Sequence, residues 1–390
     1  MISRRKLLGG IAASAAAAGT GLAFAGGRAS GAPGAKAAAS LPLTVVNKTG
    51  QYDNGSVWLY IVGNEGDRQV HVTPDGNIAP VALSDNGSDG FTDYAIPLAG
   101  SGETKLNLPQ MSGRIYVALG SKLKLKVVED GAGKAALQYP AGWVSGDPNY
   151  DIMHDCAEFT YNSSGMFCNT TMVDMFSVPL SIHLTGAQDQ TTGTLKDGAR
   201  AKVFSDLAGV DAFKKLIVGD NLRVIAPGHG MGAGVFAEDY FASYIDQVWD
   251  AYGSKDLKVT TNAGTFTGRV SGGKFSFTGP ASVSFDKPST KDVLFCDGAL
   301  AAPNDGTTGP VAAILGAGFN RSTLHNADAQ PTTDPAAFYG EDVTNHYAKA
   351  MHAATVDGKA YGFAFDDVAE FASYIQDTAP KGITLTLTPF

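Results

Sequence analysis

The sequence predicts a mainly β protein with an α/β portion. From Leu41 to about Thr185, short runs of β-branched and aromatic residues alternate with polar turn clusters, which is typical of a β-sandwich or barrel. Apolar residues at helical spacing appear in the middle of the chain, and hairpin patterns return after them. We therefore expect a β-sandwich or barrel domain at 41–185 together with 355–390, and a mixed α/β domain at 186–354.

The chain begins with a pattern typical of an export signal. Residues 1–25 contain Arg4-Arg5-Lys6, a twin-arginine pattern, followed by a small-residue apolar run and a small-x-small sequence at 23–25. A membrane anchor is the alternative, but this Ala- and Gly-rich run is short and only weakly apolar. Residues 26–40 form a Gly/Ala-rich linker. We expect secretion to the extracellular space through a twin-arginine-type signal.

The charge of the chain limits its partners. The formal net charge of −9 becomes −12 when the three basic residues of the signal are removed. An acidic protein is repelled by nucleic acid and by anionic lipid, so we expect neither a nucleic-acid partner nor a membrane association after signal removal. A neutral polysaccharide fits this charge, because hydrogen bonds and aromatic faces bind it. We expect the mature protein to be a monomer.

Individual elements follow from local patterns. Strands are expected at 43–47, 57–62, 114–119 and 383–387, where β-branched and aromatic residues gather. Helices are expected at 202–218, 240–252 and 311–318. The aromatic stripe of 240–252 is interpreted as a core face, and Gly253 as the end of that helix. Hairpins are expected from 259 to 285, with a turn at Gly272-Gly273.

A glycine-rich segment follows an expected strand at 223–228. Its sequence is Gly228-His229-Gly230-Met231-Gly232, which lacks the Lys-Ser/Thr pair of a phosphate-binding loop and has the wrong spacing for a dinucleotide fingerprint. We interpret the segment as a mobile loop.

The three cysteines are an odd number for an exported protein. Cys156 and Cys168 lie on either side of an expected turn and are a possible disulfide, although pairing around a four-residue loop does not place them directly opposite each other. Cys296 is expected to be a buried free thiol. The spacing of Cys and His offers no metal-ligand cluster, so we expect no metal and no cofactor.

Acidic residues stand out within 149–180. The aromatic and β-branched residues of this stretch predict two strands joined by a polar turn at 162–165. Alternation places Glu158 on the same strand face as Cys156 and Thr160. An acid in a strand is usually a solvated edge residue. This strand is rich in core-forming residues, however, so Glu158 should lose solvent, which favours the protonated form that a general acid needs.

The same stretch resembles glycoside hydrolase family 64. The similarity is carried by Glu158-Phe159-Thr160-Tyr161-Asn162, by Asn169-Thr170-Thr171-x-Val173-Asp174-x-Phe176, and by blocks near 112–123 and 338–368. Members of this family are β-1,3-glucanases that release laminaripentaose, and their fold is thaumatin-like. The resemblance implies two domains that flank an open groove, with β-1,3-glucan as the partner.

The resemblance also implies site residues. Glu158 matches the general acid and Asp174 the general base of an inverting mechanism, in which a water fits between the base and the anomeric carbon. The substrate-binding candidates are the polar and aromatic side chains near this pair: Thr160, Asn162, Phe167, Asn169, Thr171 and Trp143. Phe167 and Trp143 are equally well explained as core residues.

Two functions from different classes remain. The first is a secreted endo-type β-1,3-glucan hydrolase that releases short laminari-oligosaccharides, with laminaripentaose as the expected product. The second is a non-catalytic thaumatin-like protein that binds β-glucan without cleaving it, since a fold alone does not settle function. Retention of both Glu158 and Asp174 favours the enzyme, because binding alone does not require that pair.

Overall fold

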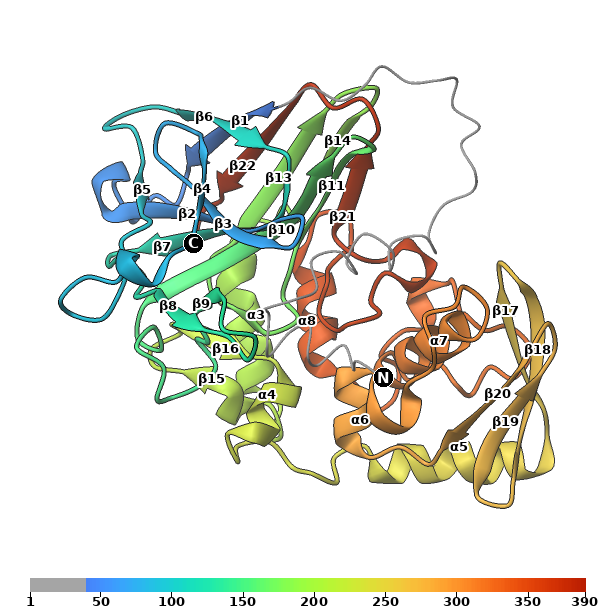
Figure 1. Cartoon of the computed structure of the whole chain (residues 1–390). Coiled ribbons are helices and arrows are strands. Elements are labelled where there is room, and N and C mark those ends of the chain that lie inside the picture. The colour runs from blue at the N-terminus through green and yellow to red at the C-terminus, as the bar shows by residue number, and fades with distance from the viewer. Residues whose placement is uncertain (1–39) are drawn as a thin grey trace.

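The structure is a computed structural model that describes residues 40–390, and this part of the chain is mainly β, as predicted. The expected export signal at 1–25 and all but the last residue of the expected linker at 26–40 lie outside the described residues. Figure 1 shows the large sheets at the upper left, the helices across the lower part of the molecule, and a separate four-stranded sheet at the lower right.

Two sheets pack face to face around one apolar core. The smaller sheet contains, in spatial order, β14 (Asp189–Thr192), β13 (Leu180–Thr185), β22 (Gly382–Leu387), β1 (Ser40–Asn47) and β6 (Thr104–Pro109). The larger sheet contains β21 (Tyr374–Asp377), β11 (Gly165–Thr170), β10 (Met153–Asn162), β7 (Met111–Leu119), β2 (Val57–Glu65), β3 (Arg68–Val72) and β4 (Ile78–Pro80). Alternate side chains of both sheets, such as Leu43, Val117 and Phe159, fill the space between them. The arrangement is a β-sandwich.

The two ends of the described chain meet in the smaller sheet. β22 is its central strand, pairing in parallel with β1 and antiparallel with β13. Leu43 lies opposite Ile383, and both side chains are buried. The N-terminal and C-terminal strands are therefore neighbours at the middle of one sheet.

Helices and a second core occupy the other part of the chain. β17 (Leu257–Thr261), β18 (Gly264–Ser271), β19 (Lys274–Thr278) and β20 (Ser282–Asp286) form an antiparallel sheet. The helices are α3 (Ala199–Ala208), α4 (Pro227–Gly232), α5 (Ala242–Ser254), α6 (Thr290–Phe295), α7 (Gly309–Asn320) and α8 (His346–Ala354). Trp249 of α5 meets Phe275 of β19 edge to face, with ring centroids 5.6 Å apart. The aromatic stripe of α5 is thus a core face, as predicted.

Most expected elements are present, with shifted ends. Of the expected helix at 202–218, only the first part is α-helical, as the end of α3. The chain then turns and reaches β15 (Ile217–Val218). The expected strand at 223–228 ends at Ile225 as β16 (Arg223–Ile225), because Pro227 begins α4. α5 extends one residue beyond Gly253, so the predicted helix end is wrong by that residue.

Three small features complete the described architecture. β12 (Met175–Phe176) pairs with β16 and joins the segment after β11 to the helical part of the chain. β8 (Lys126–Glu129) and β9 (Ala135–Gln138) form a hairpin, and β5 (Ile96–Pro97) adds to β2. Between residues 40 and 390, no helix combines the length and apolar character that a membrane span needs.

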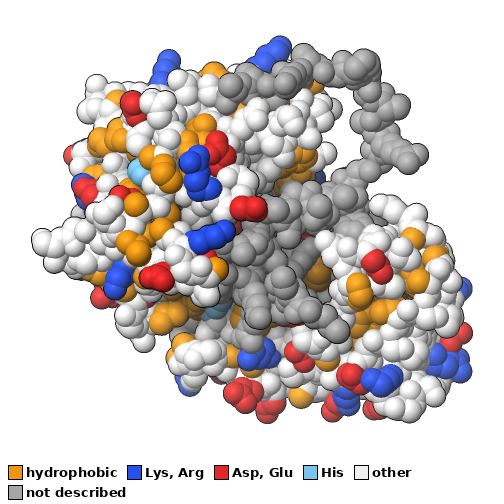
Figure 2. All heavy atoms as spheres, viewed as in Figure 1, with side chains coloured by type: hydrophobic (Ala, Val, Ile, Leu, Met, Phe, Trp, Pro, Cys, Tyr) orange, Lys and Arg blue, Asp and Glu red, His pale blue; other side chains and the backbone are white. Residues whose placement is uncertain are grey.

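One face of the molecule carries interspersed charges. Figure 2 shows acidic and basic side chains side by side along its lower edge. Ion pairs such as Arg269–Asp256 and Lys287–Asp246, both at 2.6 Å, belong to the region of α5 and the β17–β20 sheet. Exposed pairs of this kind contribute about 0–1 kcal/mol each, so they influence solubility more than stability.

Candidate active site

Glu158 projects from β10 on the face of the larger sheet that is turned away from the sandwich core. Arg114 of β7 and Asn169 of β11 lie directly opposite it on the two neighbouring strands. Arg114 Nε and Nη2 donate to Oε1 at 3.0 and 2.9 Å, and Asn169 Nδ2 donates to Oε2 at 3.2 Å. The side chain of Glu158 remains 30% exposed, so the expected loss of solvent is only partial.

Arg114 provides the positive charge beside this carboxylate. Its guanidinium is largely buried, and Nη1 donates to the Tyr116 hydroxyl at 3.1 Å. Burial opposes the charge of Arg114, but Tyr116 and Glu158 more than compensate and raise its pKa. The guanidinium therefore stays positively charged, is held by Glu158 and Tyr116, and lines the pocket.

Asp174 lies in the segment between β11 and β12. The backbone N–H of Ala226 donates to its carbonyl oxygen at 3.0 Å, which continues the pairing of β12 with β16. Its Oδ1 lies 2.7 Å from Nε2 of His229, and its side chain is 15% exposed. Burial raises the pKa of Asp174, but the His229 hydrogen bond and the charges of His229 and Arg114 outweigh it, so the net pKa is lowered.

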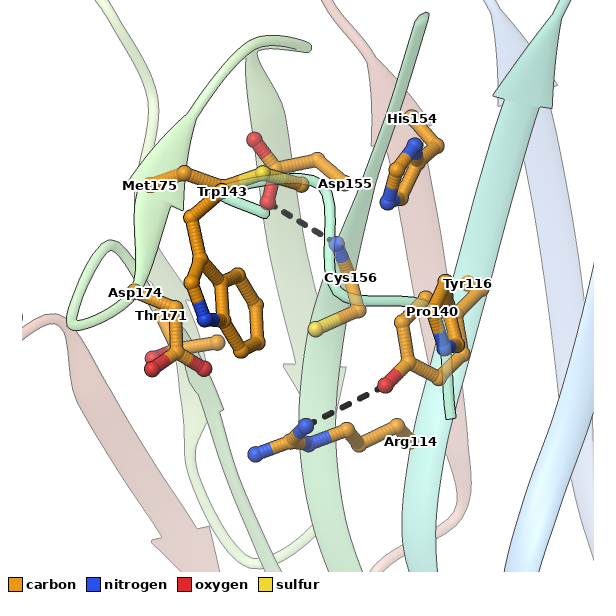
Figure 3. A pocket seen from close by; sticks show the side chains of 10 residues that line it. All are labelled: Arg114, Tyr116, Pro140, Trp143, His154, Asp155, Cys156, Thr171, Asp174 and Met175. Carbon is orange, nitrogen blue, oxygen red and sulfur yellow. Dashed lines mark hydrogen bonds between the residues drawn. The ribbon is translucent and has the colours of Figure 1, made fainter. Parts of the chain in front are cut away.

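A pocket brings several of the predicted residues together. Figure 3 shows Asp174, Thr171 and Trp143 on one side of it and Arg114 and Tyr116 on the other. Neighbouring hydroxyl and carboxylate oxygens, together with an indole ring, are the groups that bind a sugar.

The other predicted binding residues follow the strand faces. Thr160 shares the face of Glu158, and its hydroxyl lies 3.0 Å from that of Ser112. Phe167 is half-buried and lies opposite Thr160 in the pairing of β10 with β11. Asn162 lies at the hairpin turn, where its Oδ1 accepts the Ser164 N–H at 2.7 Å. The Asn162 side chain thus stabilises the hairpin turn.

The hypothesis of a disulfide between Cys156 and Cys168 is wrong. Among the described residues, all three cysteines are buried and none forms a disulfide, which confirms the interpretation of Cys296 as a buried thiol outside any disulfide. Cys168 lies opposite Phe159 and points into the sandwich core, whereas Cys156 points to the other face of the sheet. Two thiols on opposite faces of one sheet cannot approach to the distance of a sulfur–sulfur bond.

The interpretation of the segment at 228–232 as a mobile loop is also wrong. The segment lies within helix α4, with Gly228 and Gly230 buried. Pro227 at the first helical position is a helix-start signal in the sequence, and it was the available indication. The contact of His229 with Asp174 spans 55 residues, so no local pattern could have indicated it.

Comparisons with known proteins identify the family of the chain. The family model described as beta-1,3-glucanase matches residues 39–387. A glucan endo-1,3-beta-glucosidase of Cellulosimicrobium cellulans is 33% identical over 379 residues, which cover 92% of this chain and 67% of the relative. A similarly named protein of an Arthrobacter strain gives the same identity and coverage.

Solved structures give the same result. A laminaripentaose-producing beta-1,3-glucanase in complex with laminaritetraose aligns with a TM-score of 0.81 and 36% identity, covering 90% of this chain and 99% of that one. A beta-1,3-glucanase domain from Clostridium beijerinckii aligns with a TM-score of 0.78 and 29% identity, covering 92% and 100%.

The fold and the matching relatives define the class of this protein as a glycoside hydrolase. The chain belongs to glycoside hydrolase family 64, the β-1,3-glucanases. This membership favours the enzyme over the non-catalytic binding protein.

Proposed function

We propose that this protein hydrolyses β-1,3-glucan at internal bonds and inverts the anomeric carbon, with Glu158 as general acid and Asp174 as general base. One observation carries the proposal: two carboxylates from different elements have different partners, Arg114 and Asn169 for one and His229 for the other. Arg114 hydrogen-bonds to Glu158, lines the pocket with Asp174 and lowers the pKa of Asp174 through its charge, which supports the proposal that the two acids act at one site.

The chemistry assigns opposite protonation states to the two acids. Glu158 protonates the glycosidic oxygen as the bond to the anomeric carbon breaks, and Asp174 removes a proton from the water that attacks from the opposite face. Asp174 then holds a proton and Glu158 has lost one, and exchange with solvent restores both. The partners that lower the pKa of Asp174 support its role as the group that is ionised before the reaction.

Asn169 can hydrogen-bond to Glu158 in both protonation states of the acid. In the structure its amide N–H donates to Oε2 of the carboxylate. When Oε2 carries the proton, a half-turn of the amide presents Oδ1, which can accept the new O–H. One side chain can therefore support both states of the acid.

The finer features of the function are part of the same proposal. The substrate contacts are assigned to Thr160, Asn162, Phe167, Asn169, Thr171 and Trp143, and the product to laminaripentaose, since the solved relative at 36% identity is a laminaripentaose-producing enzyme. We assign the chain a thaumatin-like fold in which units 41–185 with 355–390 and 186–354 flank a groove. The protein is secreted through a twin-arginine-type signal and acts as a monomer.

The activity is tested with laminarin and curdlan. Purified protein is incubated with each glucan, and the released oligosaccharides are separated by length while proton NMR follows the anomer that forms first. The expected result is short oligosaccharides, mainly the pentaose, released as the α-anomer. Release of the β-anomer would contradict inversion, and binding without release would contradict hydrolysis.

The roles of the two acids are tested by substitution. Glu158→Gln and Asp174→Asn should each lower kcat by about 10²- to 10⁴-fold, the usual contribution of a general acid or base. Circular dichroism checks that both variants fold, and Glu103→Gln, at an exposed carboxyl, serves as the control. Azide should restore turnover of Asp174→Ala as an α-glycosyl azide, because azide attacks without a base. Near-wild-type turnover of either acid variant would contradict its role.

A further inference from the structure

His229 is held in a fixed orientation by two aromatic rings. Trp143 stacks on it, with ring centroids 4.5 Å apart and an interplanar angle of 24°. Phe295 of α6 meets it edge to face, at 5.5 Å and 81°. The side chain is 19% exposed. Packing therefore fixes the direction in which the imidazole nitrogens point.

The backbone couples His229 to Asp174 as well. Ala226 donates its N–H to the Asp174 carbonyl, and its own carbonyl accepts the N–H of His229 at 3.0 Å. Pro227 begins α4 immediately after this contact, and the first turn of the helix carries His229 back over Asp174. The two side chains are thus brought together through one shared residue, Ala226.

The hydrogen bond has a defined polarity. Asp174 is held in its ionised form, because its partners lower its pKa against the effect of burial. A carboxylate only accepts hydrogen bonds, so Nε2 of His229 carries the proton whether the ring is neutral or cationic. The bond uses Oδ1 of the carboxylate.

We propose that His229 is the positioning residue for Asp174: its Nε2–H holds Oδ1 of the carboxylate, so that Oδ2 faces the attacking water and accepts its proton. The inference rests on the proposed role of Asp174 as general base. In this scheme His229 exchanges no proton with the substrate. It keeps the Asp174 carboxylate ionised and oriented toward the attacking water while the reaction proceeds.

Other titratable groups surround the pair. Arg114 from β7, Cys156 from β10 and Tyr347 from α8 interact electrostatically with Asp174. Glu158 and Asp155 also project from β10, and burial raises the pKa of Asp155 to about 7. Asp155 therefore titrates near neutral pH, and a test of His229 must separate the titration of Asp155 from that of Asp174.

The test compares the pH profiles of two variants. His229→Leu removes the donor, whereas His229→Gln places an amide N–H where Nε2 was and does not titrate. We expect His229→Leu to lower kcat about 10- to 100-fold, a part of what a general base supplies. The acid limb of its kcat/KM profile should move to higher pH, because the partner that lowers the pKa of Asp174 is removed. His229→Gln should retain kcat within about tenfold of the wild type.

Two controls make the result specific. Asp155→Asn in the His229→Leu background should leave the shifted limb in place, which excludes Asp155 as its source. Adding His229→Leu to Asp174→Asn should lower the residual rate no further, because His229 acts through Asp174. If His229→Leu does not fold, His229→Asn replaces it, since its amide cannot reach the position of Nε2.

The outcomes separate this inference from the proposed function. An acid limb at the wild-type pH in His229→Leu, or a His229→Gln variant as impaired as His229→Leu, contradicts the role of His229. If that result comes with an inactive Asp174→Asn, only this inference fails. If Asp174→Asn keeps its turnover, the assignment of the base fails and this inference fails with it.

Discussion

Asp155 shows how one buried carboxyl connects β10 to the segment that follows Asp174. Its carboxylate accepts the backbone N–H groups of Cys156, Ser177 and Val178, at 3.0, 2.8 and 3.2 Å. Ser177 and Val178 follow β12, close in sequence to Asp174. Burial raises the pKa of Asp155 to about 7, although these hydrogen bonds and the charge of Arg223 lower it.

This raised pKa makes stability depend on pH. The folded protein binds the Asp155 proton more tightly than the unfolded chain, where such a carboxyl titrates near 3.8. Its contribution to the free energy of unfolding is therefore fully present below pH 3.8 and is lost as the pH rises to about 7. At about 1.4 kcal/mol per pKa unit, the loss is of the order of a few kcal/mol.

Asp155→Asn tests this dependence. The variant lacks the titration, so its free energy of unfolding relative to the wild type should increase between pH 4.5 and pH 8. Urea unfolding at both pH values and at pH 6 measures it. Parallel pH profiles for the two proteins would contradict the raised pKa.

Residue identities alone predicted part of the site. The alternation along 153–162 gave the face of Glu158, and Asn169 was predicted near the two acids. Arg114 was missed, because its place beside Glu158 depends on the register between β7 and β10, 44 residues apart in the chain. Register depends on the whole pattern of paired strands, so single positions do not reveal it.

At the scale of elements, close packing of α4 requires glycine at one of its positions. A methyl group at Gly230 would lie 2.2 Å from Cδ2 of Leu216, which is fully buried, whereas one at Gly232 would have no heavy atom within 4 Å. Both residues belong to the same short helix. The helix therefore has one close-packed side and one open side.

Two alanine substitutions in α4 should have opposite effects. Gly230→Ala should lower the free energy of unfolding by about 1–3 kcal/mol through overpacking, partly offset by better helix propensity, and should lower kcat by moving His229. Gly232→Ala gains up to about 1 kcal/mol of helix propensity and should leave kcat unchanged. Urea unfolding and initial rates on laminarin measure both. Equal kcat values would contradict the coupling of α4 packing to the site.

Elements were predicted more reliably than their contacts. The hairpin of β10 and β11 was expected, and Asn162 pairs with Gly165 around its turn. The disulfide hypothesis failed on the same hairpin, because the turn sets which thiol faces which side of the sheet. The helix α4 was missed because a single Pro among several glycines is a weak helix signal.

At the scale of the whole molecule, β22 contributes strongly to the stability of the sandwich because it is the central strand of the smaller sheet. It lies between β1 and β13, and its Ile383, Leu385 and Leu387 are buried. Full burial of three such side chains stabilises a fold by about 5–9 kcal/mol. This equals a large part of the total stability of an ordinary domain, which is about 5–15 kcal/mol.

Removal of β22 should therefore prevent folding. A chain that ends at Lys381 loses the central strand of the smaller sheet, and we expect it to be insoluble or to lack a cooperative thermal transition. A chain that ends at Thr388 keeps the strand and is the matched control. Thermal unfolding followed by circular dichroism compares the two. A cooperative transition in the shorter chain would contradict the central role of β22.

The whole-molecule architecture was predictable only in outline. Short alternating strands indicated a sandwich, and the expected strand at 383–387 is present. The parallel pairing of β22 with β1 was not predicted, since it joins residues 340 positions apart, as Leu43 and Ile383 are.

That pairing also has a consequence for synthesis. At a rate of about 5–20 residues per second, Leu43 leaves the ribosome roughly 20–70 s before Ile383. β6 arrives much sooner and can pair with one edge of β1, because Ser40 lies opposite Pro109. The other edge of β1 stays without its partner until β22 has been synthesised. We therefore expect the nascent sandwich to stay open, and accessible to chaperones, until β22 has been made.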